Sequence, residues 1–185
     1  FDFVFLGSSL SSDDDELEKA LRKYGNIVLP YSVNAQGAID LRPVPAEMSL
    51  GTRNNFGVIT KLQDKDGYAR KAITYLVNVK DPKQGFLSWE LEVLKVAESL
   101  DLASFSDKTY CITLRNASGE IWNIPVNSDK RSFLINFRAH TLDFKTLSFY
   151  DVMNGNFDTS AVKGKILMIG LASSLFADIH NTPIG

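Results

Sequence analysis

The sequence predicts a mixed α/β domain with a mainly parallel sheet, helices on the faces of that sheet, and an antiparallel hairpin portion. Two observations predict the parallel part. An apolar run at Phe1 to Leu6 is followed by an amphipathic segment, Asp13 to Tyr24, and a second apolar run, Asn26 to Tyr31. Strand, helix and strand with short joints indicate a parallel right-handed crossover. In addition, Ile166 to Ile169 is apolar at consecutive positions, which is typical of a strand buried on both faces.

Length and composition limit the class of protein. The 185 residues are 44% hydrophobic, which is enough for one domain with a substantial core. The net charge of −2 and the lack of a basic stripe argue against nucleic acid as a partner. The single Cys111 excludes an internal disulfide and a multi-cysteine zinc site. The abrupt beginning at Phe1 and the abrupt end at Gly185 suggest a fragment of a longer polypeptide.

The segment Asp13 to Tyr24 carries helix signals at both ends. Ser12 can cap its amino end, and Gly25 can end it. Apolar residues recur along it at helical spacing, namely Leu17, Ala20, Leu21 and Tyr24. We therefore expect an amphipathic helix that packs on the sheet.

The antiparallel portion is predicted from turn signals. Phe56 to Thr60 and Tyr68 to Val79 read as two strands around Asp64 to Gly67, which is a turn sequence. The remaining elements expected are a hairpin of 108–115 and 120–126 around the turn 116–119, strands over 132–138 and 165–171, and a short helix over 147–155.

A second long helix is predicted over Phe86 to Leu100. Only Glu92, Lys95 and Ser99 form a polar stripe on it, so most of its surface is apolar. Such a wide apolar arc indicates burial against a sheet, or packing between two subunits. The second reading would make the domain an assembly module.

Four short segments share a family pattern. They are NIVLP at 26–30, DGYAR at 66–70, LINFR at 134–138 and GKILMIG at 164–170, the last followed by Asp178 and Thr182-Pro183. In this order they resemble the CHASE2 domain, with Ala139 where the family usually has glycine. The resemblance implies one sensory domain over residues 1–185. The family's upstream strand and helix, and its downstream transmembrane helices, would lie outside this stretch.

The resemblance also implies a role. CHASE2 domains are sensory parts of bacterial membrane receptors, so we expect an extracytoplasmic location, periplasmic or extracellular, in a membrane-anchored parent protein. In that family the output is a histidine kinase, a Ser/Thr kinase or a nucleotide cyclase, as in two-component and related signalling. The expected partner is an unidentified small-molecule or protein signal. A non-binding dimerisation role, and hence a homodimer, stays open.

Polar residues at the ends of the predicted strands are the candidate site. The candidate ligand contacts are Arg70, Asn136, Arg138 and Asp178, and the structural motif positions are Asp66, Gly67 and Gly170. Arg70 either forms a structural salt bridge that fixes the hairpin or presents its guanidinium to an anion. Asn136 and Arg138 alternate with apolar residues, so they face either a cleft or solvent.

Catalytic and metal-binding arrangements are not expected in this chain. Ser173, Asp178 and His180 lie close together in sequence, but the Gly-x-Ser-x-Gly pattern of a hydrolase is absent. A metal site at Asp178 and His180 would need a third ligand, and His140 is the only other histidine. We therefore expect a non-enzymatic domain without a metal or cofactor.

Overall fold

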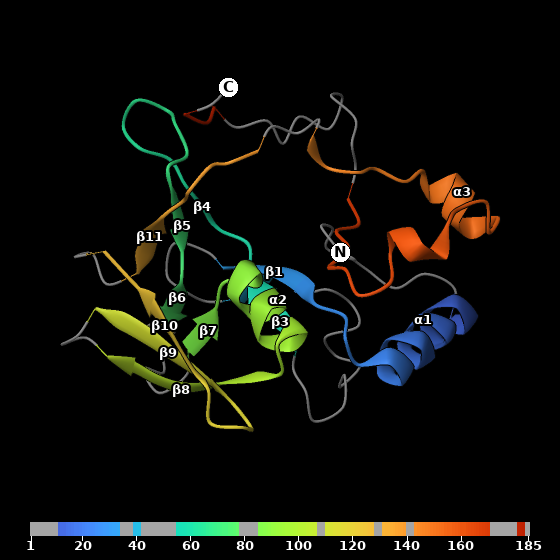
Figure 1. Cartoon of the computed structure of the whole chain (residues 1–185), viewed down its shortest axis with the longest axis horizontal. Helices are drawn as coiled ribbons and strands as arrows, with labels where there is room; N and C mark the ends of the chain where they lie inside the picture. The colour runs from blue at the N-terminus through green and yellow to red at the C-terminus, as the bar shows by residue number, and fades with distance from the viewer. Residues whose placement is uncertain are drawn as a thin grey trace.

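The computed structural model describes residues 11–33, 39–41, 55–77, 85–106, 110–127, 131–139, 143–170 and 181–183. Figure 1 shows how the described elements are arranged in space. In chain order they are α1 (Ser11–Tyr24), β1 (Leu29–Val33), β2 (Ile39–Leu41), β3 (Phe56–Val58), β4 (Lys61–Leu62), β5 (Lys71–Ile73), β6 (Tyr75–Val77), β7 (Gly85–Leu87), α2 (Trp89–Ala97), β8 (Leu100–Ser106), β9 (Cys111–Asn116), β10 (Ile121–Pro125), β11 (Ser132–Leu134), α3 (Phe149–Met153) and a 3-10 turn (Thr159–Ala161).

The described strands form small sheets that are mostly antiparallel. Their orders are β2-β1-β3, β10-β9-β8, β11-β5-β4 and β6-β7. Among these paired strands, only β1 and β3 run parallel. The prediction of a mixed α/β fold is confirmed, but the prediction of a mainly parallel sheet is wrong. Tight turns join several neighbouring strands, and only antiparallel strands can be joined that way.

The strand at Phe56 has a different partner from the one predicted. The sequence pairs Phe56 to Thr60 with the return strand, whereas β3 covers Phe56–Val58 and lies parallel to β1, with Phe56 beside Leu29. The short strand β4 takes the antiparallel place beside β5 instead. The predicted crossover from Phe1 to Leu6 lies outside the described residues.

The predicted return strand, Tyr68 to Val79, is broken at Thr74. Its side chain is fully buried, its amide donates to the Arg131 carbonyl oxygen at 2.7 Å, and its own carbonyl oxygen accepts from the Ser88 amide at 2.9 Å. These bonds take the chain from one sheet into another, because β5 pairs with β4 and β11 while β6 pairs with β7.

Helix α2 is shorter than predicted. Its amino end is capped by Ser88, whose hydroxyl oxygen accepts from the Leu91 amide at 3.3 Å, and Ser99 adopts a φ of 52° beyond its carboxyl end. Phe86 and Leu87, which were expected in the helix, belong to β7, and Leu100 begins β8, a strand that was not predicted.

The polar stripe predicted on α2 is wrong at Glu92, which is buried at 3% exposure. Lys95 reaches it with its Nζ 2.6 Å from Oε1 of Glu92. Burial raises the pKa of the Glu92 carboxyl, and the ion pair opposes that rise. A carboxyl at this position therefore carries a desolvation cost that the helical spacing did not reveal.

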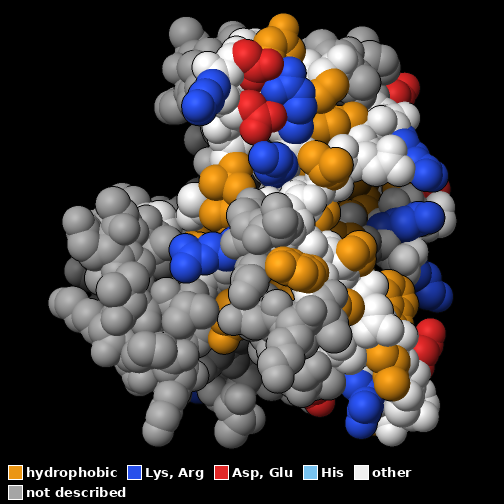
Figure 2. Space-filling model, turned by 90° about the vertical axis from the view of Figure 1, so that its left-hand side faces the viewer, with side chains coloured by type: hydrophobic (Ala, Val, Ile, Leu, Met, Phe, Trp, Pro, Cys, Tyr) orange, Lys and Arg blue, Asp and Glu red, His pale blue; other side chains and the backbone are white. Residues whose placement is uncertain are grey.

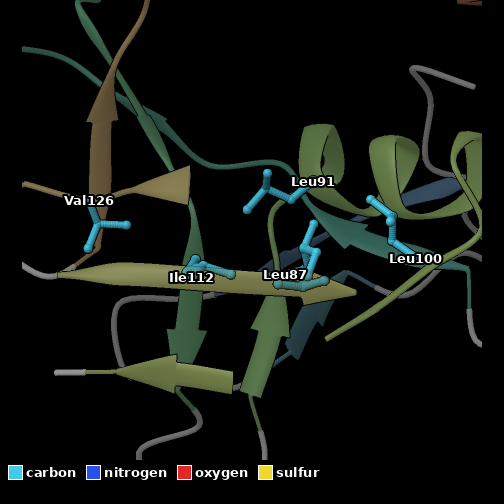
Figure 3. Packing of buried hydrophobic residues seen from close by; sticks show 6 residues of the cluster. Leu87, Leu91, Leu100, Ile112 and Val126 are labelled. Atoms are coloured by element: carbon cyan, nitrogen blue, oxygen red, sulfur yellow. The ribbon is translucent and has the colours of Figure 1, made fainter. Parts of the chain in front are cut away.

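The hydrophobic core lies where α2 meets the sheet of β8, β9 and β10. Figure 3 shows Leu87, Leu91, Leu100, Ile112 and Val126 around this contact. The same cluster includes Leu114, and Ile112 and Leu114 are fully buried. The core therefore joins the middle of the described chain into one packed unit.

Several local predictions are confirmed. Helix α1 ends at Gly25, whose amide donates to the Leu21 carbonyl oxygen at 3.2 Å with a φ of 60°. On its apolar face Leu21 is buried, but Tyr24 is exposed. The hairpin of β9 and β10 and the short helix α3 lie where the sequence places them, and the strand predicted over 132–138 is shortened to β11.

The last predicted strand, Lys165 to Leu171, is not found among the described residues. No strand of the described chain pairs with residues 165–170, and Ile166, Leu167 and Met168 are exposed by 60%, 55% and 70%. The buried environment that their apolar character requires is therefore not supplied by the elements described above.

Candidate recognition site

The site begins at the tight turn between β4 and β5. The Gly67 amide donates to the Asp64 carbonyl oxygen at 2.9 Å, and Gly67 has a φ of 82°. Asp66 accepts from the Tyr68 amide through Oδ1 at 3.2 Å. Glycine suits the left-handed backbone and aspartate suits the side-chain bond. Asp66 and Gly67 thus lie in a tight turn, at the positions where the sequence predicts one.

Arg70 joins two carboxylates across this turn. Its Nη1 donates to Oδ2 of Asp64 and to Oδ1 of Asp66, both at 2.9 Å, and its Nη2 donates to Oδ2 of Asp66 at 2.7 Å. The guanidinium carbon also lies 4.9 Å from the ring centre of Tyr68. On the other side of Asp64, Nζ of Lys71 lies 3.6 Å from Oδ1. The structure therefore shows the ion pair that the structural reading of Arg70 requires.

These contacts shift the pKa values of the charged side chains at the turn. The side-chain hydrogen bonds of Arg70, followed by the bond from the Tyr68 amide, lower the pKa of Asp66 to about 2. Hydrogen bonding to Arg70 also lowers the pKa of Asp64, and the two carboxylates raise the pKa of Arg70 in turn. Both carboxylates therefore stay ionised at neutral pH. Figure 2 shows acidic and basic side chains gathered at the upper end of its face, where Figure 1 places this turn.

Two distant segments reach the strand that follows the turn. The Ile135 amide donates to the Arg70 carbonyl oxygen at 2.9 Å, and the Ala69 amide donates to the Asn181 carbonyl oxygen, also at 2.9 Å. Tyr68 and Asn181 form a parallel bridge. We call residues 64–71, 135–138 and 181–183 the three-segment junction.

Arg138 is held by the residue two positions before it. When the amide oxygen of Asn136 faces Arg138, it accepts from Nε and from Nη2, each at 2.9 Å. Both side chains are exposed. An amide is neutral, so this contact orients the Arg138 guanidinium without neutralising its charge.

The predicted site residues are thus partly brought together. The structure places Arg70 in the junction and Asn136 and Arg138 on one of its segments, while Asp178 lies outside the described residues. Gly170 lies within the described residues and is exposed. It does not follow a strand there, although the sequence predicts one before it. Sequence reasoning missed the roles of Asp64 and Asn181. For Asp64 a signal existed, because it faces Arg70 across a short hairpin.

The described residues include no group of three or more His, Cys, Asp or Glu side chains placed to hold a metal ion. None of the helices in these ranges has both the length and the apolar character needed to cross a bilayer.

Comparison with known families decides the membership of the chain. The family model of the CHASE2 domain matches residues 1–185, which is the whole chain. The chain belongs to the CHASE2 domain family. CHASE2 domains are extracytoplasmic sensory domains of signalling receptors. The junction described above is thus a feature of a sensory domain. No curated protein and no solved structure shows a significant match to this CHASE2 chain.

Proposed function

We propose that this CHASE2 domain recognises a small anionic solute at the three-segment junction, as the input of a membrane-anchored receptor. The observation that carries the proposal is the convergence of three segments far apart in the sequence. Residues 64–71, 135–138 and 181 meet through the bonds from Ile135 to Arg70 and from Ala69 to Asn181. A solute bound there would contact all three, so it would favour one relative placement of them.

The charges of the junction support an anion. Arg70 and Lys71 lie against Asp64 and Asp66, so these four charges balance. Arg138 adds a positive charge whose orienting partner is a neutral amide. A guanidinium oriented in this way suits a carboxylate or phosphate, which it can bind through two parallel hydrogen bonds.

The signal would be carried by a shift of populations. If the solute binds one arrangement of the three segments more tightly than another, binding favours that arrangement by the difference in affinity. In the parent receptor this change would be relayed across the membrane to a cytoplasmic kinase or cyclase output.

A thermal-shift screen with carboxylates and inorganic phosphate tests the proposal. A bound anion should raise the Tm of the chain, and the increase should disappear in Arg138→Gln. The matched control is Arg115→Gln, which removes an exposed guanidinium on β9, outside the three segments of the junction. An equal response in both variants, or no response to any anion in the unaltered chain, would contradict the proposal.

An assembly role is the second candidate, and α3 is the observation that favours it. The apolar arc of α2 is largely used within the chain, since Trp89 and Leu91 are buried there. In contrast, α3 exposes Phe149, Tyr150 and Met153 by 68%, 72% and 69%. Such a patch is typical of contact with a second copy.

Sedimentation of the chain over a range of concentrations tests the assembly role. A dimer should form as the concentration rises, and it should weaken in Phe149→Ser. The control is Ser148→Ala, which alters a neighbouring position without removing apolar surface. A strictly monomeric chain, or a dimer unaffected by Phe149→Ser, would argue against assembly through α3.

A further inference from the structure

Residues 143–170 form a folded segment in which no residue is buried. Local hydrogen bonds shape its backbone. The Val152 amide donates to the Ser148 carbonyl oxygen in α3, and the Lys163 amide donates to the Thr159 carbonyl oxygen in the turn that follows, both at 3.1 Å. Figure 1 shows this segment on the side of the molecule away from the sheet of β8, β9 and β10. We call residues 143–170 the outer segment.

Helix α3 cannot be held by its own hydrogen bonds. It has five residues, and a helix that short is not stable alone in water. None of those five residues is buried. Something must therefore pack on α3 from outside the described part of the chain.

The apolar surface of the outer segment is as large as a protein interface. Seven large apolar residues are more than half exposed, namely Phe144, Phe149, Tyr150, Met153, Ile166, Leu167 and Met168. With about 200 Å² for each fully exposed residue, their exposed surface amounts to roughly 900 Å². The largest apolar patch of a typical monomer is about 300–600 Å², whereas a stable complex buries about 800 Å² on each partner. The area is therefore sufficient for a stable dimer.

The charges of the outer segment favour a second copy of the chain as the partner. Its part up to residue 158 carries three aspartates and one lysine, and its remaining part carries Lys163 and Lys165. The net charge of the whole segment is thus zero. An anionic membrane or an acidic protein would require a positive surface. A surface that is acidic at one end, basic at the other and balanced as a whole is complementary to a second copy turned by 180°.

We propose that a second copy of this chain covers the outer segment about a two-fold axis, with α3 of each copy against residues 163–168 of its partner. The proposal rests on the assembly role given above, and it defines the surface and the direction of that contact. In this arrangement Asp151 of one copy lies near the partner's Lys165, and the pair occurs twice. The aromatic side chains of α3 then cover the apolar run 166–168 of the other copy.

Charge reversal combined with mixing tests the direction of the contact. Asp151→Lys and Lys165→Asp should each raise the Kd of the dimer roughly tenfold, because like charges then meet at two places. An equimolar mixture of the two variants should dimerise with a Kd close to that of the unaltered chain, since each contact then joins a lysine to an aspartate. Sedimentation over a range of concentrations measures all three samples.

The control makes the same charge changes outside the outer segment. Glu98 and Lys19 are both exposed, at the end of α2 and within α1. Glu98→Lys and Lys19→Asp should leave the Kd unchanged, whether alone or mixed. Amide hydrogen exchange provides a second measurement that needs no substitution. Raising the concentration of the unaltered chain should increase protection over residues 149–153 and 166–168 together, but not over β9.

The outcomes separate this arrangement from the assembly role itself. A dimer that weakens in Phe149→Ser but ignores both charge reversals, or a mixture that binds no more tightly than its two components, would overturn the arrangement and leave the assembly role standing. A chain that stays monomeric would overturn both. Strong protection of residues 166–168 in such a monomer would assign the cover to the chain itself. The anion response of the three-segment junction is independent of these results.

Discussion

Replacing Gly57 with alanine tests the contact between β3 and α2. A Cβ atom built at Gly57 would lie 2.2 Å from the Cα atom of Trp89, 2.7 Å from its amide nitrogen and 3.0 Å from its Cβ atom. The first two atoms belong to the backbone at the beginning of α2, so no side-chain rotation relieves the clash. Gly57 is therefore needed because the two elements approach closely.

The magnitude follows from the displacement that alanine would impose. Ordinary contact begins near 3.4 Å, so α2 and β3 must separate by about 1.2 Å at this point. The helix carries the buried side chains of Trp89 and Leu91, and separation would loosen their packing. Overpacking costs about 1–3 kcal/mol, and a backbone clash belongs at the upper end. A loss of about 3 kcal/mol corresponds to a Tm lower by roughly 6–12 °C for a chain of this size.

Urea unfolding monitored by circular dichroism provides the measurement. The matched control is Gly119→Ala in the hairpin of β9 and β10, where φ is 88° and no atom lies within 4 Å of a built Cβ. That variant has backbone strain without a clash, at about 1–2 kcal/mol. If Gly57→Ala unfolds within about 0.5 kcal/mol of the unaltered chain, the close approach of β3 and α2 is not a feature of the protein.

Three further predictions concern ionisation and capping. Burial raises the folded-state pKa of Glu92 above its value in the unfolded chain, so its contribution to stability is present at low pH and is lost as pH rises through the folded pKa. Relative to the unaltered chain, the free energy of unfolding of Glu92→Gln should therefore increase as pH rises above the ordinary pKa of a glutamate; a difference that does not change with pH would refute this. For Asp66 the sign is opposite. Because Arg70 lowers its pKa from 3.8 to about 2, the stability that Asp66 contributes is lost as pH falls through that interval. Acid unfolding of Asp66→Asn should lack this loss, and an unchanged pH profile would show that the ion pair contributes nothing. Finally, Ser88→Ala should destabilise the chain by about 1 kcal/mol, because its hydroxyl caps α2. Ser148→Ala should have little effect, because Ser148 makes no side-chain bond at the start of α3; equal losses would refute the capping argument.

Elements that depend on neighbouring residues were predictable. The end of α1 at Gly25, the turn at Asp66 and Gly67, and the end of α3 at Gly155 all lie where the sequence places them. The ion pair of Arg70 with Asp66 is also local, since the two residues are four positions apart across one turn. Each of these features is satisfied by contacts within a few positions.

The candidate site was predictable only in its parts. The sequence singled out Arg70, Asn136 and Arg138, but nothing in it showed that the Arg70 carbonyl oxygen accepts from Ile135 or that Asn181 reaches Ala69. Those bonds join positions separated by 65 residues or more along the chain, so no local pattern encodes them.

By itself, the sequence determined the family of this CHASE2 domain, the turn at Asp66 and Gly67, and the carboxyl ends of α1 and α3. Tertiary structure alone decided that β3 lies parallel to β1, that the return strand changes sheet at Thr74, and that Glu92 is buried on the side of α2 expected to face solvent. The physical reason is the range of the interactions. A cap or a turn is satisfied by its own neighbours, whereas the partner of a strand and the burial of a helix face depend on which distant surfaces the chain brings together.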